Sequence, residues 1–412
     1  MRLIHTSDWH LGHRFHGRQR HEEQGRFLDW LVGSIEEQGI EALLVAGDIF
    51  DTTAPGSRAQ ALYYRFLHRL ASSPCRHVVI TGGNHDSPAL LEAPRELLRQ
   101  LDIHVVGMAD GNPDKEILLL RDGQGLPELL ICAVPFLRDR DIRQAAAGET
   151  LEEKGRQLRE GIRAHYQQVC ELADQRRREI DANLPLVVMG HLFVAGGRTM
   201  EGDGVRELMV GGLDRIDSSS FPEWIDYLAL GHLHHGQQVA GSPTRRYCGA
   251  PLPMSFAEAG LRKAILLLTT RGRDVSVTPL TVPVFQSLAS LHGDMGQLLA
   301  GLAQLKIHPD PAWVELIYEG ETVVPRLRDE LLAAVEGSAL SVLRIRDSRI
   351  YDYVLRQAQE AESLDDLSVD EVFERCLESN HIEQGQRQIL RGAFAEIVAA
   401  VEHATSAPET AP

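Results

Sequence analysis

Five short apolar runs of this chain each end in a cluster of aspartate, asparagine or histidine. The clusters are Asp8-Trp9-His10, Gly47-Asp48, Gly83-Asn84-His85-Asp86, Gly190-His191 and Gly231-His232-Leu233-His234. Leucine-rich and β-branched runs separated by amphipathic stretches are typical of an α/β domain. In such sheets ligands bind at strand ends, because the loops there bring residues distant in sequence to one edge of a rigid platform. We therefore expect an α/β fold with a polar site at that edge.

The donor atoms in these clusters are oxygen and imidazole nitrogen, without any thiolate. This set suits Mn²⁺, Fe²⁺ or Zn²⁺ better than a closed structural zinc site. The candidate ligands number seven: Asp8, His10, Asp48, Asn84, His191, His232 and His234. Seven side chains are too many for one ion, whereas two ions bridged by a carboxylate would use them all. Two ions about 3.5–4 Å apart can clamp the attacking and leaving oxygens of a phosphoryl group.

Spacing within the clusters agrees with a shared site. Asp8 and His10, like His232 and His234, stand two residues apart and point the same way if the chain is extended there. A glycine before four of the candidate ligands lets the backbone turn sharply without a Cβ clash. Each motif alone is more often an ordinary turn. Five in succession, each closing an apolar run, favour a common metal site.

Charge and cysteine content limit the class of protein. The net charge of −17 counts against a nucleic-acid partner, but residues 360–412 hold twelve acidic side chains against three arginines, so about half of the excess lies there. The five cysteines are scattered, which argues against a disulfide framework and a thiolate metal site. Charged residues within the first eight positions leave no room for a signal peptide, and no apolar run approaches membrane-spanning length. We expect a cytoplasmic protein.

The chain is long enough for two or three domains. We expect an α/β domain at 1–280, a smaller α/β domain at 281–350, and a linker with two helices at 351–412. Strands are expected at 3–6, 42–46, 77–81, 129–134, 186–189, 227–230, 285–291, 312–318 and 341–345. Helices are expected around 27–35 and at 59–70, 295–305, 324–335, 369–378 and 383–403. Ser368 and Glu371 match a capping box at the start of the first helix of the terminal pair.

The order D-x-H, G-D, G-N-H-D, G-H and G-H-x-H resembles the calcineurin-like metallophosphoesterase superfamily. The longer stretches His5-Thr-Ser-Asp-Trp-His-Leu-Gly12, Val45-Ala-Gly-Asp-Ile-Phe-Asp51 and Tyr247-Cys-Gly-Ala-Pro251 resemble, within it, the bacterial nuclease subunits of SbcCD complexes. The resemblance covers almost the whole chain. It implies an α/β/β/α sandwich with a small α/β capping domain and a C-terminal helix pair.

The resemblance also implies roles for single residues. Asp8, His10, Asp48 and His234 would hold one ion, and Asp48, Asn84, His191 and His232 the second, with Mn²⁺ preferred. His85 matches the family's catalytic histidine, which helps the 3′ oxygen depart, and Asp86 would orient His85 or cap its turn. Relatives outside the bacterial branch carry a second histidine shortly after the G-D motif. This chain has Asp51 there, so we nominate no second catalytic histidine.

The activity implied is a metal-dependent DNA phosphodiesterase, a double-strand exonuclease and hairpin endonuclease acting in repair, recombination and replication. The partners implied are double-stranded and hairpin DNA and an SbcC-type ATPase, which would bind the C-terminal helices, in a heterotetramer containing two copies of this chain. Arg14 and Arg18 follow the first motif and are candidate DNA contacts, with Arg138, Arg140 and Arg143 weaker ones. Two alternatives stay open, a small-molecule phosphoesterase and a DNA-end scaffold whose site has decayed.

Overall fold

The computed structural model describes most of the chain up to residue 348. The described residues are 1–142, 150–195, 216–307, 310–320, 322 and 324–348, with the single residues 373, 387, 390, 391 and 394. The expected helix pair at 369–378 and 383–403, its capping box and Arg143 therefore lie outside the described residues, apart from five isolated positions. None of the described helices is both long and apolar enough to cross a bilayer.

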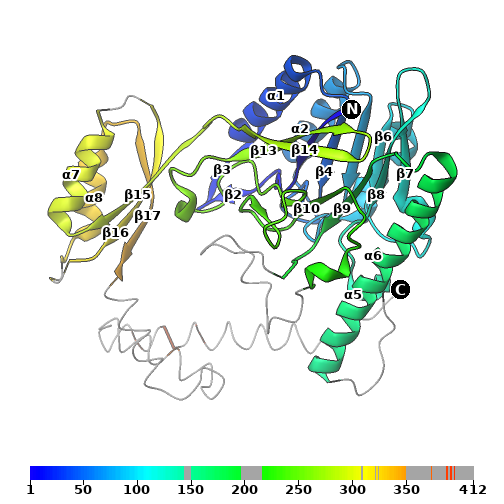
Figure 1. The fold of residues 1–412 in the computed structure, drawn as a ribbon. Coiled ribbons are helices and arrows are strands. Elements are labelled where there is room, and N and C mark those ends of the chain that lie inside the picture. The colour runs from blue at the N-terminus through cyan, green and yellow to red at the C-terminus, as the bar shows by residue number, and fades with distance from the viewer. Residues whose placement is uncertain are drawn as a thin grey trace, which may run out of the picture. The chain divides into compact units, whose positions relative to one another are not determined.

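Two six-stranded sheets form the larger part of the molecule (Figure 1). The first has the order β14-β13-β1-β4-β5-β6, and its strands are β1 (Arg2–Thr6), β4 (Ala42–Ala46), β5 (His77–Thr81), β6 (Ile103–Val106), β13 (Ala264–Arg271) and β14 (Asp274–Thr281). Strands β1, β4, β5 and β6 run parallel, and β13 is antiparallel to its two neighbours β1 and β14. The carboxyl ends of β1, β4 and β5 therefore meet at one edge.

The second sheet has the order β11-β12-β10-β9-β8-β7. Its strands are β7 (Ile117–Arg121), β8 (Pro127–Ala133), β9 (Leu186–His191), β10 (Tyr227–Gly231), β11 (Gln237–Gln238) and β12 (Arg245–Tyr247). Strands β8, β9, β10 and β12 are parallel. Strand β4 of the first sheet contacts β9 and β10 of the second. The two sheets are therefore stacked face to face.

Helices cover the outer faces of both sheets (Figure 1). Helices α1 (His21–Gln38) and α2 (Ser57–Leu70) share the core of the first sheet, and α6 (Leu151–Ile180) packs on β8 and β9 of the second. Shorter helices are α3 (Pro88–Glu92), α4 (Arg95–Arg99) and α5 (Asp139–Ile142), and a hairpin joins β2 (Arg14–Phe15) to β3 (Arg18–Gln19). The layers are helix, sheet, sheet, helix, which confirms the expected α/β/β/α sandwich.

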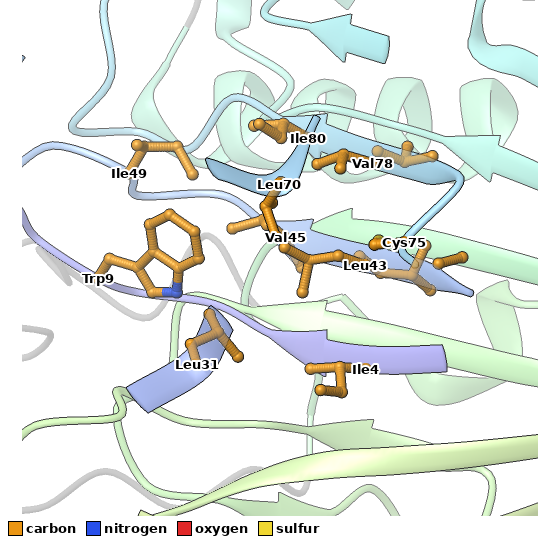
Figure 2. Packing of buried hydrophobic residues seen from close by; sticks show 14 of the residues in the cluster. Ile4, Trp9, Leu31, Leu43, Val45, Ile49, Leu70, Cys75, Val78 and Ile80 are labelled. Carbon is orange, nitrogen blue, oxygen red and sulfur yellow. The ribbon is translucent and has the colours of Figure 1, made fainter. Parts of the chain in front are cut away.

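The continuous apolar runs arise because the central strands are buried on both faces. Along β8, Leu129 and Ile131 join the core between the sheets, whereas Leu130 and Cys132 face the core under α6. Figure 2 shows how Leu31 of α1 and the side chains of β4 pack in the first core. Trp9 is buried beside them, with its ring centroid 5.2 Å from that of Phe66. The apolar middle residue of the first motif thus anchors its two polar neighbours.

A third sheet has three strands in the order β15-β16-β17. The strands are β15 (Ser287–Gly293), β16 (Ala312–Tyr318) and β17 (Leu340–Asp347), and the helices between them are α7 (Met295–Leu305) and α8 (Leu327–Val335). Leu298, Leu302 and Leu331 of the two helices are buried. Every element expected between 285 and 345 is present, with bounds within about five residues of those expected.

Compact packing divides the chain into two units. The larger contains Met1–Ser290, Gln304–Glu315 and Val335–Arg344, and the smaller includes Leu291–Ala303 and Leu316–Ala334. This division runs through β16 and β17, so the expected domain limits 1–280, 281–350 and 351–412 stay predictions. Among elements that the sequence argument did not name, β6, β7, β13, β14 and α6 complete the sandwich.

Candidate metal centre

The five polar clusters lie at the carboxyl ends of β1, β4, β5, β9 and β10. The first three strands are neighbours in one sheet, and the last two are neighbours in the other. Because β4 packs against β9 and β10, the clusters of the two sheets face each other at the same end of the sandwich. All seven candidate ligands are brought together there.

One half of the centre joins Asp8, His10 and His234. One ligand atom from each lies within 4.8 Å of the other two, and all three residues are buried. Nε2 of His10 is 3.1 Å from Nε2 of His234. Two ring nitrogens and a carboxylate thus converge from β1 and from the loop after β10. These are the donors that first-row divalent ions favour.

The other half joins Asp48, Asn84, His191 and His232. Nε2 of His191 lies 3.2 Å from Oδ2 of Asp48 and 3.0 Å from Oδ1 of Asn84. Nδ1 of His232 is 3.1 Å from the same amide oxygen. Nδ1 of His191 donates to the carbonyl of Ala46 at 2.9 Å, so in the neutral ring Nε2 carries the lone pair. Three acceptor atoms then face one another, an arrangement that needs a cation or a proton between them.

Asp48 lies between the two halves. Its Oδ2 is 3.2 Å from Nε2 of His191 and 3.6 Å from Nε2 of His10. Its Oδ1 accepts the backbone N–H of His85 at 2.9 Å, which fixes the carboxylate in place. Oδ2 therefore lies near both halves, and the donor set present here fits divalent metal ions.

The backbone at the candidate ligands is strained. Asp8, His10, Asp48 and His232 have φ angles of 54°, 45°, 51° and 100°. Such values are uncommon for residues other than glycine and cluster at functional sites. The chain is therefore not extended at these residues, so the expectation that side chains two residues apart point the same way there is wrong. His232 and His234 lie in different halves of the centre because the chain turns between them.

The glycines before the ligands act mainly through close packing. Only Gly47 of the four has a positive φ, 82°. A Cβ on Gly231 would lie 1.8 Å from the carbonyl oxygen of Ala46. That carbonyl accepts the hydrogen bond that orients His191, so glycine here allows β10 to approach β4 closely. The expected need for a sharp backbone turn is confirmed at Gly47. At Gly231 glycine is needed because the neighbouring backbone lies too close for a Cβ.

The electrostatics follow from burial and from the carboxylate of Asp48. Burial lowers the pKa of His191, but the charge of Asp48 outweighs it and raises this pKa to about 9. Burial and then the charge of His191 lower the pKa of His232 to about 3. Burial also holds the pKa of His234 well below its usual value. In the protein without a cation, these shifts favour a protonated His191 beside the Asp48 carboxylate and leave His232 and His234 neutral, each with a lone pair to offer.

His85 lies beside the centre and is assigned to neither half, although donor atoms of His85, His10 and Asp51 also lie within 4.8 Å of one another. Its Nδ1 donates to the carbonyl of Asp51 at 2.8 Å, and its ring centroid is 4.9 Å from that of His10. The side chain of Asp51 lies 3.3 Å from Nδ1 of His10. Asp51 thus positions two histidines, a role that sequence reasoning missed. The only sequence feature that could have indicated this role is the position of Asp51 three residues after the candidate ligand Asp48.

Asp86 caps the loop and does not orient His85. Its carboxylate accepts the backbone N–H groups of Ile49, Phe50 and Gly83 at 3.1, 2.9 and 2.9 Å. Burial and the nearby charge of Asp48 raise the pKa of Asp86 to about 6. Of the two expected roles, the contacts support the capping role. This carboxylate ties the loop after β5 to the loop after β4.

The expected DNA-contact arginines lie in different environments. Arg14 and Arg18 are exposed on the hairpin of β2 and β3, which directly follows the first motif. Arg138 is half-buried, donates to the carbonyl of Asp86 at 3.0 Å and stacks on Phe136 at 5.8 Å. Within the described part of the chain, Nη1 of Arg138 is buried and has no hydrogen-bond partner. Because the Phe136 ring contacts His191, this guanidinium lies next to the centre.

Two family models match separate parts of the chain. Residues 1–236 match the model of the calcineurin-like phosphoesterase family. Residues 284–381 match the model of the SbcD C-terminal family, described as the type 5 capsule protein repressor C-terminal domain. The first match contains all seven candidate ligands and His85, and the second begins just before β15.

Curated relatives match nearly the full length. The chain is 38% identical over 397 residues to the SbcD protein of the SbcCD nuclease of Escherichia coli (strain K12), covering 96% of this chain and 97% of that one. It is 32% identical to the SbcD protein of Rhodobacter capsulatus, covering 85% and 88%. It is 33% identical to that of Bacillus subtilis (strain 168), covering 66% of each chain.

Proposed function

Because this chain belongs to the SbcD nucleases of the calcineurin-like phosphoesterase family, we propose that it cleaves DNA phosphodiester bonds at the centre described above. The proposed activities are double-strand exonuclease and hairpin endonuclease. The chain would work as the nuclease component of an assembly with an SbcC-type ATPase, in DNA repair, recombination and replication. The assembly would contain two copies of this chain and would act in the cytoplasm.

The observation that carries this proposal is the convergence of seven donor side chains, Asp48 among them, at one end of the sandwich, with Oδ2 of Asp48 within 3.2 Å of His191 and 3.6 Å of His10. Two divalent ions, with Mn²⁺ preferred, would supply Lewis acidity and a nucleophile at neutral pH when bound there. Asp8, His10 and His234 would hold one ion, and Asn84, His191 and His232 the other. Imidazole donors favour Mn²⁺ over Mg²⁺, which prefers an all-oxygen octahedral shell.

His85 is the proposed catalytic acid. Its Nδ1–H is engaged by the carbonyl of Asp51, so His85 would act as an acid in its doubly protonated form and transfer the proton on Nε2, which leaves the neutral ring. That atom would donate to the departing 3′ oxygen as the phosphodiester breaks. The backbone hydrogen bond from His85 to Asp48 keeps the ring at a set position relative to the carboxylate that joins the two halves.

Substrate binding falls to arginines around the centre. Arg138 presents a buried guanidinium nitrogen that lacks a partner among the described residues, and a phosphate oxygen would satisfy it. Arg14 and Arg18, on the hairpin after the first motif, would contact neighbouring phosphates of the DNA backbone. Three arginines able to contact separate phosphates would suit a polymeric substrate better than a small phosphoester.

The test is cleavage of a labelled, hairpin-ended duplex by the purified full chain. The reaction is run with Mn²⁺ or Mg²⁺, with and without the ATPase partner and ATP, and with Asp48→Asn as the inactive control. We expect Mn²⁺-dependent cleavage of duplex and hairpin that the ATPase partner increases and Asp48→Asn lacks.

Other outcomes would revise separate parts of the proposal. Intact DNA together with hydrolysis of a small phosphodiester would retain the metal centre and reject the substrate class. No hydrolysis of any phosphoester, with no metal retained after purification, would favour a DNA-end scaffold with a decayed site. Equal cleavage by Asp48→Asn would reject the assignment of the centre itself.

A further inference from the structure

A second group of metal-competent side chains lies at the opposite ends of the same strands. His77 is the first residue of β5, and Asp102 and His104 flank the first residue of β6. One donor atom from each of the three lies within 4.8 Å of the other two. The metal centre described above follows the last residues of β5, so this group, here called the β5–β6 triad, occupies the other edge of the sheet.

The sheet register places the two histidines on one face. Strands β5 and β6 are parallel, and Val79 pairs with His104. Side chains two residues apart on a strand share a face, so His77 lies on the same face as Val79 and therefore as His104. Asp102 stands two residues before His104, the same D-x-H spacing as in the first motif of the chain.

The hydrogen bonding of His77 leaves a donor atom ready for a ligand. Its Nε2 is 2.8 Å from the carbonyl of Arg121 in β7 of the second sheet, and a carbonyl can only accept, so Nε2 carries the proton. The neutral ring then has its lone pair on Nδ1. That atom is buried and finds no hydrogen-bond partner in the described chain, and only 9% of His77 is exposed. Metal-bound histidines are commonly held by such a bond from the second nitrogen to a carbonyl.

The charges around the triad are compatible with a cation. Arg76 donates to the same carbonyl of Arg121 at 3.2 Å, but its guanidinium is paired with Glu41 and Glu128 at 2.7 and 2.9 Å. Asp102 is exposed and His104 half-buried, so an ion can enter from solvent. Two imidazoles and one carboxylate are donors that Zn²⁺ accepts, and a water molecule would complete a four-coordinate shell.

We propose that His77, Asp102 and His104 bind one Zn²⁺ ion at the edge of the sandwich away from the catalytic centre. The ion would join β6, the last strand of the first sheet, to β5, and through the His77–Arg121 hydrogen bond it would link both to β7. Its role is structural, since the three ligands are remote from the residues assigned to catalysis. This proposal does not depend on the proposed function.

The test is Zn²⁺ stoichiometry of the full chain, measured by equilibrium dialysis at pH 7.5 and metal analysis. We expect His104→Ala to bind one equivalent less than the wild type and Asp102→Asn to bind the same equivalent at least tenfold more weakly. His68→Ala, which removes an exposed histidine of α2, is the matched control and should bind as the wild type does. Asp48→Asn should keep the triad equivalent while losing ions from the other centre.

Equal Zn²⁺ binding by His104→Ala, His68→Ala and the wild type would overturn the proposal. So would loss of the triad equivalent in Asp48→Asn, since the ion would then belong to the catalytic centre. Circular dichroism checks that each variant is folded. If His104→Ala is not, the exposed and nearly isosteric Asp102→Asn decides, and unchanged Zn²⁺ affinity in that variant rejects the triad.

Discussion

Single residues at the centre have separable tasks, because the atoms that face the two halves differ from those that hold the side chains in place. The backbone N–H of His85 binds Oδ1 of Asp48, and its Nδ1 binds the carbonyl of Asp51. Both contacts position the residue and leave its Nε2 free for chemistry. His191 uses Nδ1 for positioning and Nε2 for the site. A substitution can therefore remove one task and leave the other measurable.

For His85→Gln we expect cleavage of duplex DNA to fall by at least about 100-fold, the usual contribution of a general acid. The Mn²⁺ content should be unchanged, because His85 is absent from both halves of the centre. The two measurements are initial cleavage rate and metal analysis after dialysis. Loss of metal in this variant would show that His85 is a ligand, and unchanged cleavage would show that it has no catalytic part.

His5 makes the stability of the fold depend on pH. Burial lowers the pKa of His5 to about 3, whereas in the unfolded chain it is about 6.5. As the pH falls below 6.5 the unfolded chain binds this proton and the folded chain does not, so stability is lost progressively down to about pH 3. At pH 5.0 the loss from this group alone is about 2 kcal/mol.

The measurement is urea unfolding of the wild type and His5→Gln at pH 7.5 and 5.0. We expect the drop in unfolding free energy between the two pH values to be about 2 kcal/mol smaller in the variant. Other buried histidines contribute equally to both proteins and cancel in the comparison. Identical drops would mean that His5 titrates normally in the folded protein.

At the scale of elements, the centre depends on how closely β10 approaches β4. We expect Gly231→Ala to destabilise the fold by at least about 2 kcal/mol and to weaken Mn²⁺ binding, because the new Cβ would lie 1.8 Å from a backbone carbonyl. Gly33→Ala is the control, since Gly33 is exposed on α1 and its Cβ would meet nothing within 4 Å, and it should stabilise by about 1 kcal/mol. Chemical unfolding and Mn²⁺ titration give both numbers, and equal stability of the two variants would contradict the close-approach argument.

Elements could be predicted where the burial pattern was regular along the whole element. The expected strands 42–46 and 77–81 match β4 and β5 residue for residue, because strands buried on both faces are continuous apolar runs. The expected helix 295–305 matches α7 in the same way. Strand β14 was missed because it alternates between exposed and half-buried residues and ends in no polar cluster. Long α6 was missed because its apolar residues are diluted by many charged ones.

At the scale of the whole molecule, we expect metal binding to be coupled to folding, since the seven candidate ligands come from positions 8 to 234 and meet only in the folded chain. An ion that binds only the folded state stabilises it by about 2.7 kcal/mol at 100 times its dissociation constant. We expect Mn²⁺ at that excess to raise the melting temperature of the wild type by several degrees and a chelator to lower it. Asp48→Asn should shift by less than half as much, and a melting temperature of the wild type unaffected by either treatment would argue against the centre.

The sequence by itself determined which residues are the candidate ligands, because donor side chains directly after apolar runs can be recognised without knowing how the strands pair. Tertiary structure decided how those residues are shared. Oδ2 of Asp48 lies near both halves, and His232 and His234 separate, because β4 packs against β9 and β10 and the backbone turns at positive φ. Asp51 and the β5–β6 triad could not be found in the same way. The triad is brought together only by the register of β5 and β6. Asp51 reaches His85 and His10 only because the loops after the strands pack on one another.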